Sequence, residues 1–486
     1  MRFLLINLIF FTSSLHLQGQ KPLSAPQQQP AAKGHLIPVT LTPLKNCTIY
    51  LGSYFGKGMT LVDSARLNEK SQGVFKGSAK LTGGIYFVVS PNYSIQFELL
   101  MDAGQQFSIA GDTANKEKAV IAGSLDNDLF RQYVIFSTEK GKLKQQLEQS
   151  YRNAATLADS IRLRASILQI DSELDAYRNL MSKNNPRSLL TMLFNTMKRP
   201  TPPAVPLIKG IPDSAYPYRF VKDHFWDDVL FNDDRMLRTP FFEAKLDDYF
   251  KYYVSPDADS IIGEVKYMLI SARTGKEMYP YLLTKFTNKY ISPEFMGQDK
   301  VFVYLFENHY AKGDTVLLNP ASRKTITERA YSLMANQLGL PAPVLDLTDT
   351  TGKKVSLYGI RAPFTIVAFW DPNCGHCKEE IPQLDSLYSA KWKAEGVAVY
   401  SVNIYENEVP AWKKFIAEKT LSKDWVHAYQ TKEAKLAEEK SGLPNYRQLY
   451  DISQTPTIYL LDKDKRIIAK KLSLAQFDKL MEAKRK

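Results

Sequence analysis

Two cysteines separated by two residues form the part of this chain best suited to chemistry. Cys374 and Cys377 follow a strongly apolar run, residues 364–370, whose pattern predicts a buried strand. Pro372 and Asn373 break that strand, and we expect a helix to begin at or near Cys374. The first turn of a helix stabilises a thiolate through its free amides and its dipole. The spacing therefore predicts thiol–disulfide exchange, with an exposed nucleophilic Cys374 and an inner resolving Cys377.

Other uses of such a pair find little support in the sequence. A zinc site would need two more ligands, but the one remaining cysteine, Cys47, is far away and no two histidines are four residues apart. A peroxidase of the peroxiredoxin type carries Thr or Ser three residues before its reactive cysteine, where this chain has Asp371. We therefore expect no metal. The chain also carries no flavin or nicotinamide motif, so we expect no cofactor.

Four features accompany the pair: a tryptophan four residues before the first cysteine, a proline five residues after the second, a Thr-Pro dipeptide before a later apolar strand, and a Lys-x-Glu-x-Pro pattern. In that order they are Trp370, Pro382, Thr455-Pro456 before residues 458–461, and Lys378-x-Glu380-x-Pro382. In this combination the chain resembles the thioredoxin superfamily, specifically its bacterial extracytoplasmic TlpA/ResA-like branch. The resemblance covers roughly residues 340–486.

The resemblance implies roles for several residues. Trp370, Thr455 and Pro456 would shape the groove in which a partner cysteine docks, with the proline in the cis form. The dipeptide Gly375-His376 is the one found in protein disulfide isomerases, and we expect it to tune the redox pair; a protonated His376 would raise the thiolate fraction.

One position departs from the thioredoxin pattern. Thioredoxin has a buried aspartate six residues before its first cysteine, and this chain has Ala368 there. In ResA-like proteins a glutamate near the motif is implicated in proton handling, and Glu380 matches it. Glu380 is three residues after Cys377 and shares a helix face with it. It is a candidate catalytic acid or base, although the same residue type is common on a solvated helix surface.

The start of the chain predicts export. Residues 1–20 combine an early arginine, an apolar core over 3–11 and a small or polar end, as in a secretory signal peptide. No cysteine lies there, so we do not expect a lipoprotein. No later stretch is long enough to span a membrane, so we expect the mature protein to lie in the periplasm or cell envelope. The net charge of +12 is spread over 486 residues without a basic block, which argues against nucleic acid as a partner.

Three domains are predicted after a Pro- and Gln-rich linker at residues 21–35. Residues 36–118 alternate apolar and polar residues between turn signals and predict an all-β accessory domain. Residues 119–338 predict a mainly helical middle domain, with one helical periodicity over 143–180. Residues 339–486 predict an α/β thioredoxin fold. The two accessory domains resemble those attached to thioredoxin-like proteins of Bacteroidetes-type bacteria.

Taken together, these patterns predict an exported thiol–disulfide oxidoreductase that reduces or isomerises disulfides in extracytoplasmic proteins. Its partners would be protein thiols or disulfides, and a membrane redox protein would have to recycle Cys374 and Cys377, because the chain itself carries no redox cofactor motif. A non-enzymatic binding protein is the alternative, because about two thirds of the chain is not thioredoxin-like. In that case the cysteine pair would form a structural or sensing disulfide.

Overall fold

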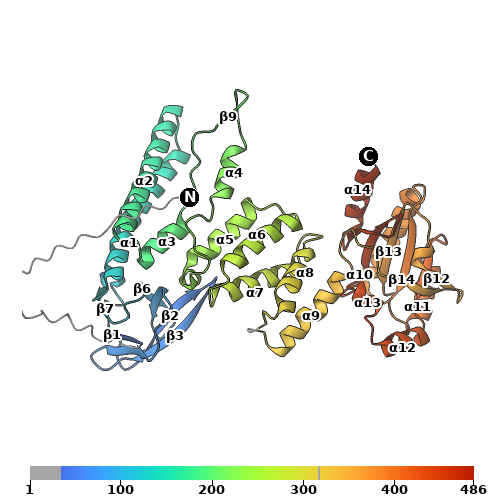
Figure 1. Ribbon diagram of the computed structural model, residues 1–486, viewed down its shortest axis with the longest axis horizontal. Coiled ribbons are helices and arrows are strands. Elements are labelled where there is room, and N and C mark those ends of the chain that lie inside the picture. The colour runs from blue at the N-terminus through green and yellow to red at the C-terminus, as the bar shows by residue number, and fades with distance from the viewer. Residues whose placement is uncertain (1–33, 316–317, 486) are drawn as a thin grey trace, which may run out of the picture.

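The computed structural model describes residues 34–315 and 318–485; the predicted signal peptide and most of the predicted linker lie outside the described residues. A strand-rich part comes first, a helical part lies in the middle, and a mixed α/β part forms the C-terminal end. Figure 1 shows the strand-rich part at one end of the long axis, with the first helices beside it, and the C-terminal part at the other end. This architecture confirms the predicted fold class.

The strand-rich part is built from two four-stranded sheets, ordered β4-β1-β7-β8 and β3-β2-β5-β6. Along β1 the side chains alternate between buried and exposed, as expected for a strand with one face on a core. Residues from both sheets, including Ile37 and Leu51, share that core. The strands are β1 (His35–Thr42), β2 (Thr48–Phe55), β3 (Gly58–Arg66), β4 (Gln72–Gly77), β5 (Gly84–Val89), β6 (Ile95–Met101), β7 (Ser108–Asp112) and β8 (Val120–Ala122).

The middle part is mainly helical and has its own aromatic-rich core. Its helices are α1 (Leu125–Arg152), α2 (Leu157–Asn184), α3 (Leu189–Met197), α4 (Tyr216–Asp223), α5 (Pro240–Tyr252), α6 (Ala258–Ser271), α7 (Met278–Tyr290), α8 (Asp299–Asn308) and α9 (Pro320–Met334). A small hairpin, β9 (Leu207–Ile208) and β10 (Ile211–Pro212), and three short turns of helix, η1 (Lys116–Lys118), η2 (Asp234–Arg238) and η3 (Tyr310–Lys312), complete the first two parts.

The helical periodicity over residues 143–180 belongs to two helices, because the chain turns back between them. Helix α1 ends at Arg152, and the Thr156 side chain accepts a hydrogen bond from the Asp159 amide (3.1 Å) to cap the start of α2. Apolar periodicity continues across such a turn when both helices present an apolar face to each other. The ion pair between Lys144 and Asp171 (2.5 Å) then joins the two helices.

The C-terminal part is a seven-stranded sheet in the order β12-β11-β15-β14-β13-β16-β17. Its strands are β11 (Asp346–Asp349), β12 (Lys354–Ser356), β13 (Phe364–Trp370), β14 (Ala398–Asn403), β15 (Val426–Tyr429), β16 (Thr457–Asp462) and β17 (Ile467–Lys470). Its helices are α10 (Gly375–Leu387), α11 (Val409–Glu418), α12 (Lys432–Ser441), α13 (Tyr446–Leu449) and α14 (Leu474–Arg485), with the short turns η4 (Leu357–Gly359) and η5 (Tyr388–Trp392).

The central strand β13 is buried on both faces. Ile366, Ala368 and Trp370 pack against one core, which also holds Cys377 of α10. Val367 and Phe369 pack against a second core on the other side of the sheet. A strand covered on both faces is mostly apolar, and this explains why β13 is apolar at every position except the buried Thr365.

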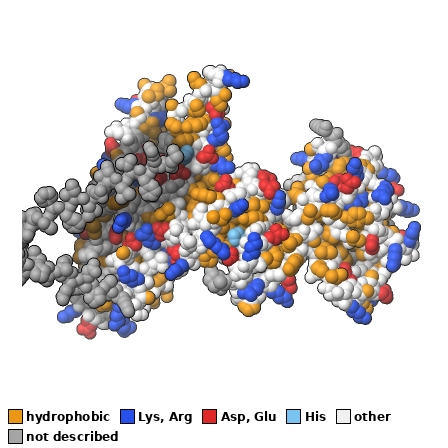
Figure 2. Space-filling view, viewed as in Figure 1, with side chains coloured by type: hydrophobic (Ala, Val, Ile, Leu, Met, Phe, Trp, Pro, Cys, Tyr) orange, Lys and Arg blue, Asp and Glu red, His pale blue; other side chains and the backbone are white. Residues whose placement is uncertain are grey.

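The helices and the surface both bear on the predicted location and partners. In the part of the chain that the structure describes, no helix is both long enough and apolar enough to cross a bilayer. Figure 2 shows lysine and arginine side chains interspersed with aspartate and glutamate on the face in view. On this face the net positive charge is therefore spread rather than gathered in one patch.

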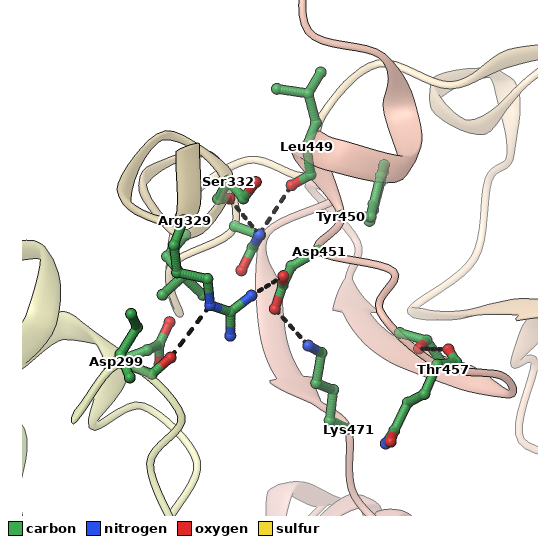
Figure 3. A network of polar contacts seen from close by, with 12 residues as sticks. Asp299, Arg329, Ser332, Leu449, Tyr450, Asp451, Thr457 and Lys471 are labelled. Atoms are coloured by element: carbon green, nitrogen blue, oxygen red, sulfur yellow. Dashed lines mark hydrogen bonds and ion pairs between the residues drawn. The ribbon is translucent and has the colours of Figure 1, made fainter. Parts of the chain in front are cut away.

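A network of polar groups joins the helical part to the C-terminal part. We call it the junction network; it consists of the buried residues Asp299, Asn336, Asp451 and Lys470, the partly buried Arg329 and the exposed Lys471. The Lys470 Nζ donates to Asp299 Oδ2 (2.7 Å) and to Asn336 Oδ1 (2.6 Å), and both Lys470 and Asp299 are buried. Asp451 accepts from Arg329 with one carboxylate oxygen and from Lys471 with the other, 2.5 Å away (Figure 3). The two parts are therefore held together by paired charges.

We predict that the substitution Asp299→Ala strongly destabilises the protein. It leaves the Lys470 ammonium buried without a counter-charge, which costs about 3–5 kcal/mol. The measurement is the free energy of unfolding in guanidinium chloride. The control is Glu328→Ala, which removes an exposed ion pair with Lys324 and should cost less than about 1 kcal/mol. Equal effects of the two substitutions would contradict the proposed importance of the buried pair.

Candidate active site

The first cysteine follows the carboxyl end of β13, so it lies at one end of the central strands of the sheet. After Trp370 the chain turns, and Asp371 accepts hydrogen bonds from the Asn373 amide (Oδ1, 2.8 Å) and from the Cys374 amide (backbone carbonyl, 3.2 Å). Cys374 occupies the position that precedes the first residue of α10. The helix begins at Gly375, as the sequence predicts, so Cys374 lies where the helix amides are unpaired.

The Cys374 thiol is half-buried and its ionised form is stabilised. Its Sγ donates to the Thr455 carbonyl oxygen at 3.4 Å. Burial raises the pKa of the thiol, but hydrogen bonds with the Thr455 side chain, the Cys377 amide and thiol, and the His376 amide outweigh burial and hold the pKa below its ordinary value. A thiol with a lowered pKa is ionised to a larger fraction than an ordinary cysteine at the same pH, and at a partly exposed site that thiolate can act as a nucleophile.

Cys377 has the opposite environment. It is completely buried in the first turn of α10, among the side chains of the core that covers this face of the sheet. Burial raises its pKa to about 12. Both cysteines are free thiols in this structure. The pair therefore consists of one thiol that ionises readily and one that stays protonated until its surroundings change.

The loop that precedes β16 lies beside the two sulfurs. Strands β13 and β16 pair antiparallel, with Phe369 opposite Thr457, so the loop before β16 meets the loop after β13 at the same edge of the sheet. The Thr455–Pro456 peptide bond is cis, as the resemblance implied. The Thr455 side chain acts to lower the pKa of both thiols, so it lies close to Cys374 and to Cys377.

Trp370 does not line an open groove, contrary to our expectation. Its side chain is fully buried, and its Nε1 donates to the Ser401 hydroxyl at 2.8 Å. The side chain faces the same core as Cys377, because alternate residues of β13 point to the same face of the sheet. It therefore supports the site from beneath and cannot contact a docked partner in this conformation.

The other predicted site residues lie on the first turns of α10. Gly375 and His376 are both exposed, and it is the amide of His376, not its imidazole, that contributes to the low pKa of Cys374. Glu380 lies one turn after Cys377, next to the exposed Glu379. Ala368 is fully buried beneath them and supplies no proton acceptor.

One contact at the site has no signal in the local sequence. The Asn373 side chain donates to Glu408 Oε2 at 2.8 Å, which ties the loop before Cys374 to the start of α11. The Val409-Pro410 sequence indicates a helix start after Glu408, but nothing in it connects that start to Asn373. Within the described residues, no group of three His, Cys, Asp or Glu side chains is arranged to hold a metal ion.

Comparisons with known proteins agree with this geometry. Residues 338–470 match the AhpC/TSA family. The thiol–disulfide oxidoreductase ResA of a Bacillus cereus strain is 27% identical over 134 residues, which are 28% of this chain and 69% of the relative. The C-terminal domain belongs to the thioredoxin-like thiol–disulfide oxidoreductases. Its features are those of the TlpA/ResA type.

Two solved structures are also similar to this thioredoxin-like chain. One is a domain of a possible thiol–disulfide isomerase from Cytophaga hutchinsonii, 36% identical, with a TM-score of 0.26, covering 30% of this chain and 92% of that one. The other is a thioredoxin-like protein from Bacteroides caccae, 22% identical, with a TM-score of 0.44, covering 59% of this chain and 99% of that one. Residues 170–319 of the middle domain match a domain of unknown function, DUF5106.

We predict that iodoacetamide modifies Cys374 and spares Cys377 in the reduced, folded protein. The rate at Cys374 should reach half its maximum below about pH 8.5, the ordinary pKa of cysteine, and Thr455→Val should raise that midpoint by removing a hydrogen bond to the thiolate. Mass spectrometry after digestion measures modification at each site. The unfolded protein is the control, because both cysteines should then react alike. A midpoint unaffected by Thr455→Val would contradict the role of that hydroxyl.

Proposed function

We propose that this protein is an exported thiol–disulfide oxidoreductase that uses the Cys374-Gly375-His376-Cys377 motif to reduce or isomerise disulfides in extracytoplasmic proteins. The observation that carries the proposal is the asymmetry of the two thiols. Cys374 is accessible and has a lowered pKa, whereas Cys377 is buried and has a pKa of about 12. A structural disulfide would need no such difference, but ordered attack and resolution do.

The reaction begins with the Cys374 thiolate. Its sulfur attacks one sulfur of a substrate disulfide, a new S–S bond forms, and the other substrate sulfur leaves as a thiolate that takes up a proton. The helix-start amides of His376 and Cys377 stabilise the attacking charge before the reaction. They lose this role once Cys374 is bonded to substrate, since its sulfur is then neutral.

Cys377 completes the exchange. It loses its proton, attacks the Sγ of Cys374, and releases the second substrate sulfur as a thiolate. The substrate has then gained two electrons, and Cys374 and Cys377 share a disulfide. For another reducing cycle an upstream dithiol donor must return two electrons, and we propose a membrane redox protein for that role. In an isomerase cycle a second thiolate of the substrate attacks the mixed disulfide, forms a new substrate disulfide and releases the Cys374 thiolate, so that no net electrons are transferred and no donor is needed.

Proton transfer at Cys377 needs a group close to it. Glu380 follows Cys377 by three residues on the same face of α10, and we assign it this acid–base role. Ala368, which lies beneath the helix, has no group that could take the role instead. We assign Gly375 and His376 the role of tuning the redox pair, because these exposed residues directly follow Cys374.

A partner chain would dock along the loop that contains Thr455 and Pro456. The Thr455 carbonyl is 3.4 Å from the Cys374 Sγ, so any chain bonded to that sulfur passes directly beside this backbone. An extended chain there can form hydrogen bonds with the backbone groups of this loop. The signal-peptide pattern of residues 1–20 supports a periplasmic or cell-envelope location, where substrate disulfides form and persist.

We predict that Cys377→Ser accumulates a mixed disulfide between Cys374 and a protein substrate. The first attack proceeds, but no thiol remains to resolve the product. Non-reducing electrophoresis with oxidised insulin as substrate measures the trapped species, and Cys374→Ser is the control that should trap nothing. If neither variant traps substrate and the wild-type pair never cycles, the pair is structural and the protein is a binding protein.

We predict that Glu380→Gln slows disulfide exchange by about 100-fold, the lower end of what a lost acid or base costs. The Gln side chain keeps the shape but cannot exchange a proton. The measurement is the pH profile of kcat for insulin reduction, which should lose one ionisation. Glu379→Gln is the matched control, because this neighbouring carboxylate is exposed and should leave the profile unchanged. Identical profiles for the two variants would refute the role of Glu380.

A further inference from the structure

A cavity of about 360 Å³ lies where the helical part meets the thioredoxin-like domain. We call it the junction cavity. One wall comes from the middle domain, from the segment 292–297 together with Arg329 and Leu333 of α9. The opposite wall comes from the thioredoxin-like domain, from residues 451, 453–454 and 470–472 and from Gln476. The cavity therefore exists only because both domains are present.

The junction cavity extends to the residue just before the loop that contacts the reactive sulfur. Gln454 lines it, and the following residue, Thr455, accepts the hydrogen bond from Cys374. On the same wall, the Lys471 amide donates to the Ile458 carbonyl at 2.8 Å, so the segment after β17 runs beside the start of β16. Leu472 packs against the core that also contains Cys377. A chain that leaves the sulfur along the cis-proline loop therefore enters this cavity.

The two walls are fixed relative to each other by the junction network. Asp451, on the thioredoxin side, holds Arg329 of α9 and Lys471 (Figure 3). Asn336 donates to the Leu449 carbonyl at 2.9 Å, and the Lys470 amide donates to the sulfur of Met296 at 3.4 Å. Because buried pairs of this kind tolerate little displacement, the middle-domain wall has a defined position beside the redox loop.

The rim of the cavity carries exposed apolar side chains. Phe295 is 55% exposed and Met296 is 39% exposed, and both lie in the segment that forms the middle-domain wall. An aromatic and a flexible thioether side chain bind varied apolar partners. The charges on the floor are already paired with one another, through Arg329 and Lys471 with Asp451 and through Lys470 with Asp299. Glu294 and several neutral polar residues also line the cavity, so the apolar surface that it offers comes from Phe295 and Met296 at the rim together with Leu333 and Leu472.

We propose that the junction cavity is the second half of the substrate groove and that it binds the extended polypeptide segment next to the reacting cysteine, with an apolar side chain against Phe295 and Met296. The middle domain thus selects disulfides that lie within apolar, extended sequence. This inference rests on the proposed oxidoreductase function and adds the class of substrate. It gives the middle domain a direct part in recognition.

The test compares two peptide substrates that differ only beside the disulfide. Each peptide has one cysteine in disulfide linkage with a small thiol; one peptide carries leucine on both sides of the cysteine and the other carries serine. We expect the full-length protein to have a kcat/KM about tenfold higher for the leucine peptide, which corresponds to about 1.4 kcal/mol. Equal values of kcat/KM for the two peptides would overturn the proposal without any variant.

The variant Phe295→Glu tests whether the preference for the leucine peptide comes from the junction cavity. It places a charge on the rim, and the leucine-to-serine ratio of kcat/KM should fall from about ten to about one. Ile270→Glu is the matched control, because Ile270 is a similarly exposed apolar residue (63%) of the same domain, on α6 and outside the cavity lining. An unchanged ratio in Phe295→Glu, or an equal loss in Ile270→Glu, would overturn the proposal. Failure of the oxidoreductase function itself would look different, since neither peptide would then be reduced.

Discussion

The antiparallel register between β13 and β16 is the constraint on which the site depends. Because Phe369 lies opposite Thr457, the loop that follows β13 and the loop that precedes β16 leave the sheet at the same place. The first loop carries Cys374 to the start of α10, and the second brings Thr455 against its sulfur. A shift of one residue would turn every side chain of β13 to the opposite face and separate the two loops. The register therefore determines that the Cys374 sulfur and the Thr455 loop lie side by side.

The difference between the two thiols follows from this placement and from one turn of helix. Cys374 precedes the helix and meets unpaired amides, while Cys377 lies inside the first turn and faces the core. The same helix therefore lowers one pKa through hydrogen bonds while burial raises the other. No additional charged residue is needed to make the pKa values of the two thiols different. The two pKa values can therefore differ even though Ala368, beneath the site, carries no ionisable group. The candidate for proton transfer, Glu380, lies on the helix itself.

Local sequence patterns predicted the redox loop well, but they could not predict contacts between residues that are distant in the sequence. The apolar run of β13, the helix start at Cys374 and the loop before β16 are each contained in a few consecutive residues. Trp370 was placed in the groove because its distance from Cys374 matched a family pattern, but strand alternation buries it. Asn373 and Glu408 are separated by a strand, and Asp299 and Lys470 by most of a domain. Pairings of this kind follow from the packing of separate elements, and no periodicity in the sequence encodes them.

The junction network gives the middle domain a physical connection to the redox loop. Taking Lys470 and Asp299 out of water costs free energy that two apolar side chains of the same size would not require, so stability alone does not explain the pair. However, a buried ion pair forms only when its two charged groups are in contact, so it restricts the two surfaces to one relative position. Here that position brings the segment 292–297 to the same cavity as Ser453 and Gln454, which directly precede Thr455. A buried ion pair at this interface is thus best understood as a device for orientation, which places the apolar rim of one domain within reach of the reactive sulfur of the other.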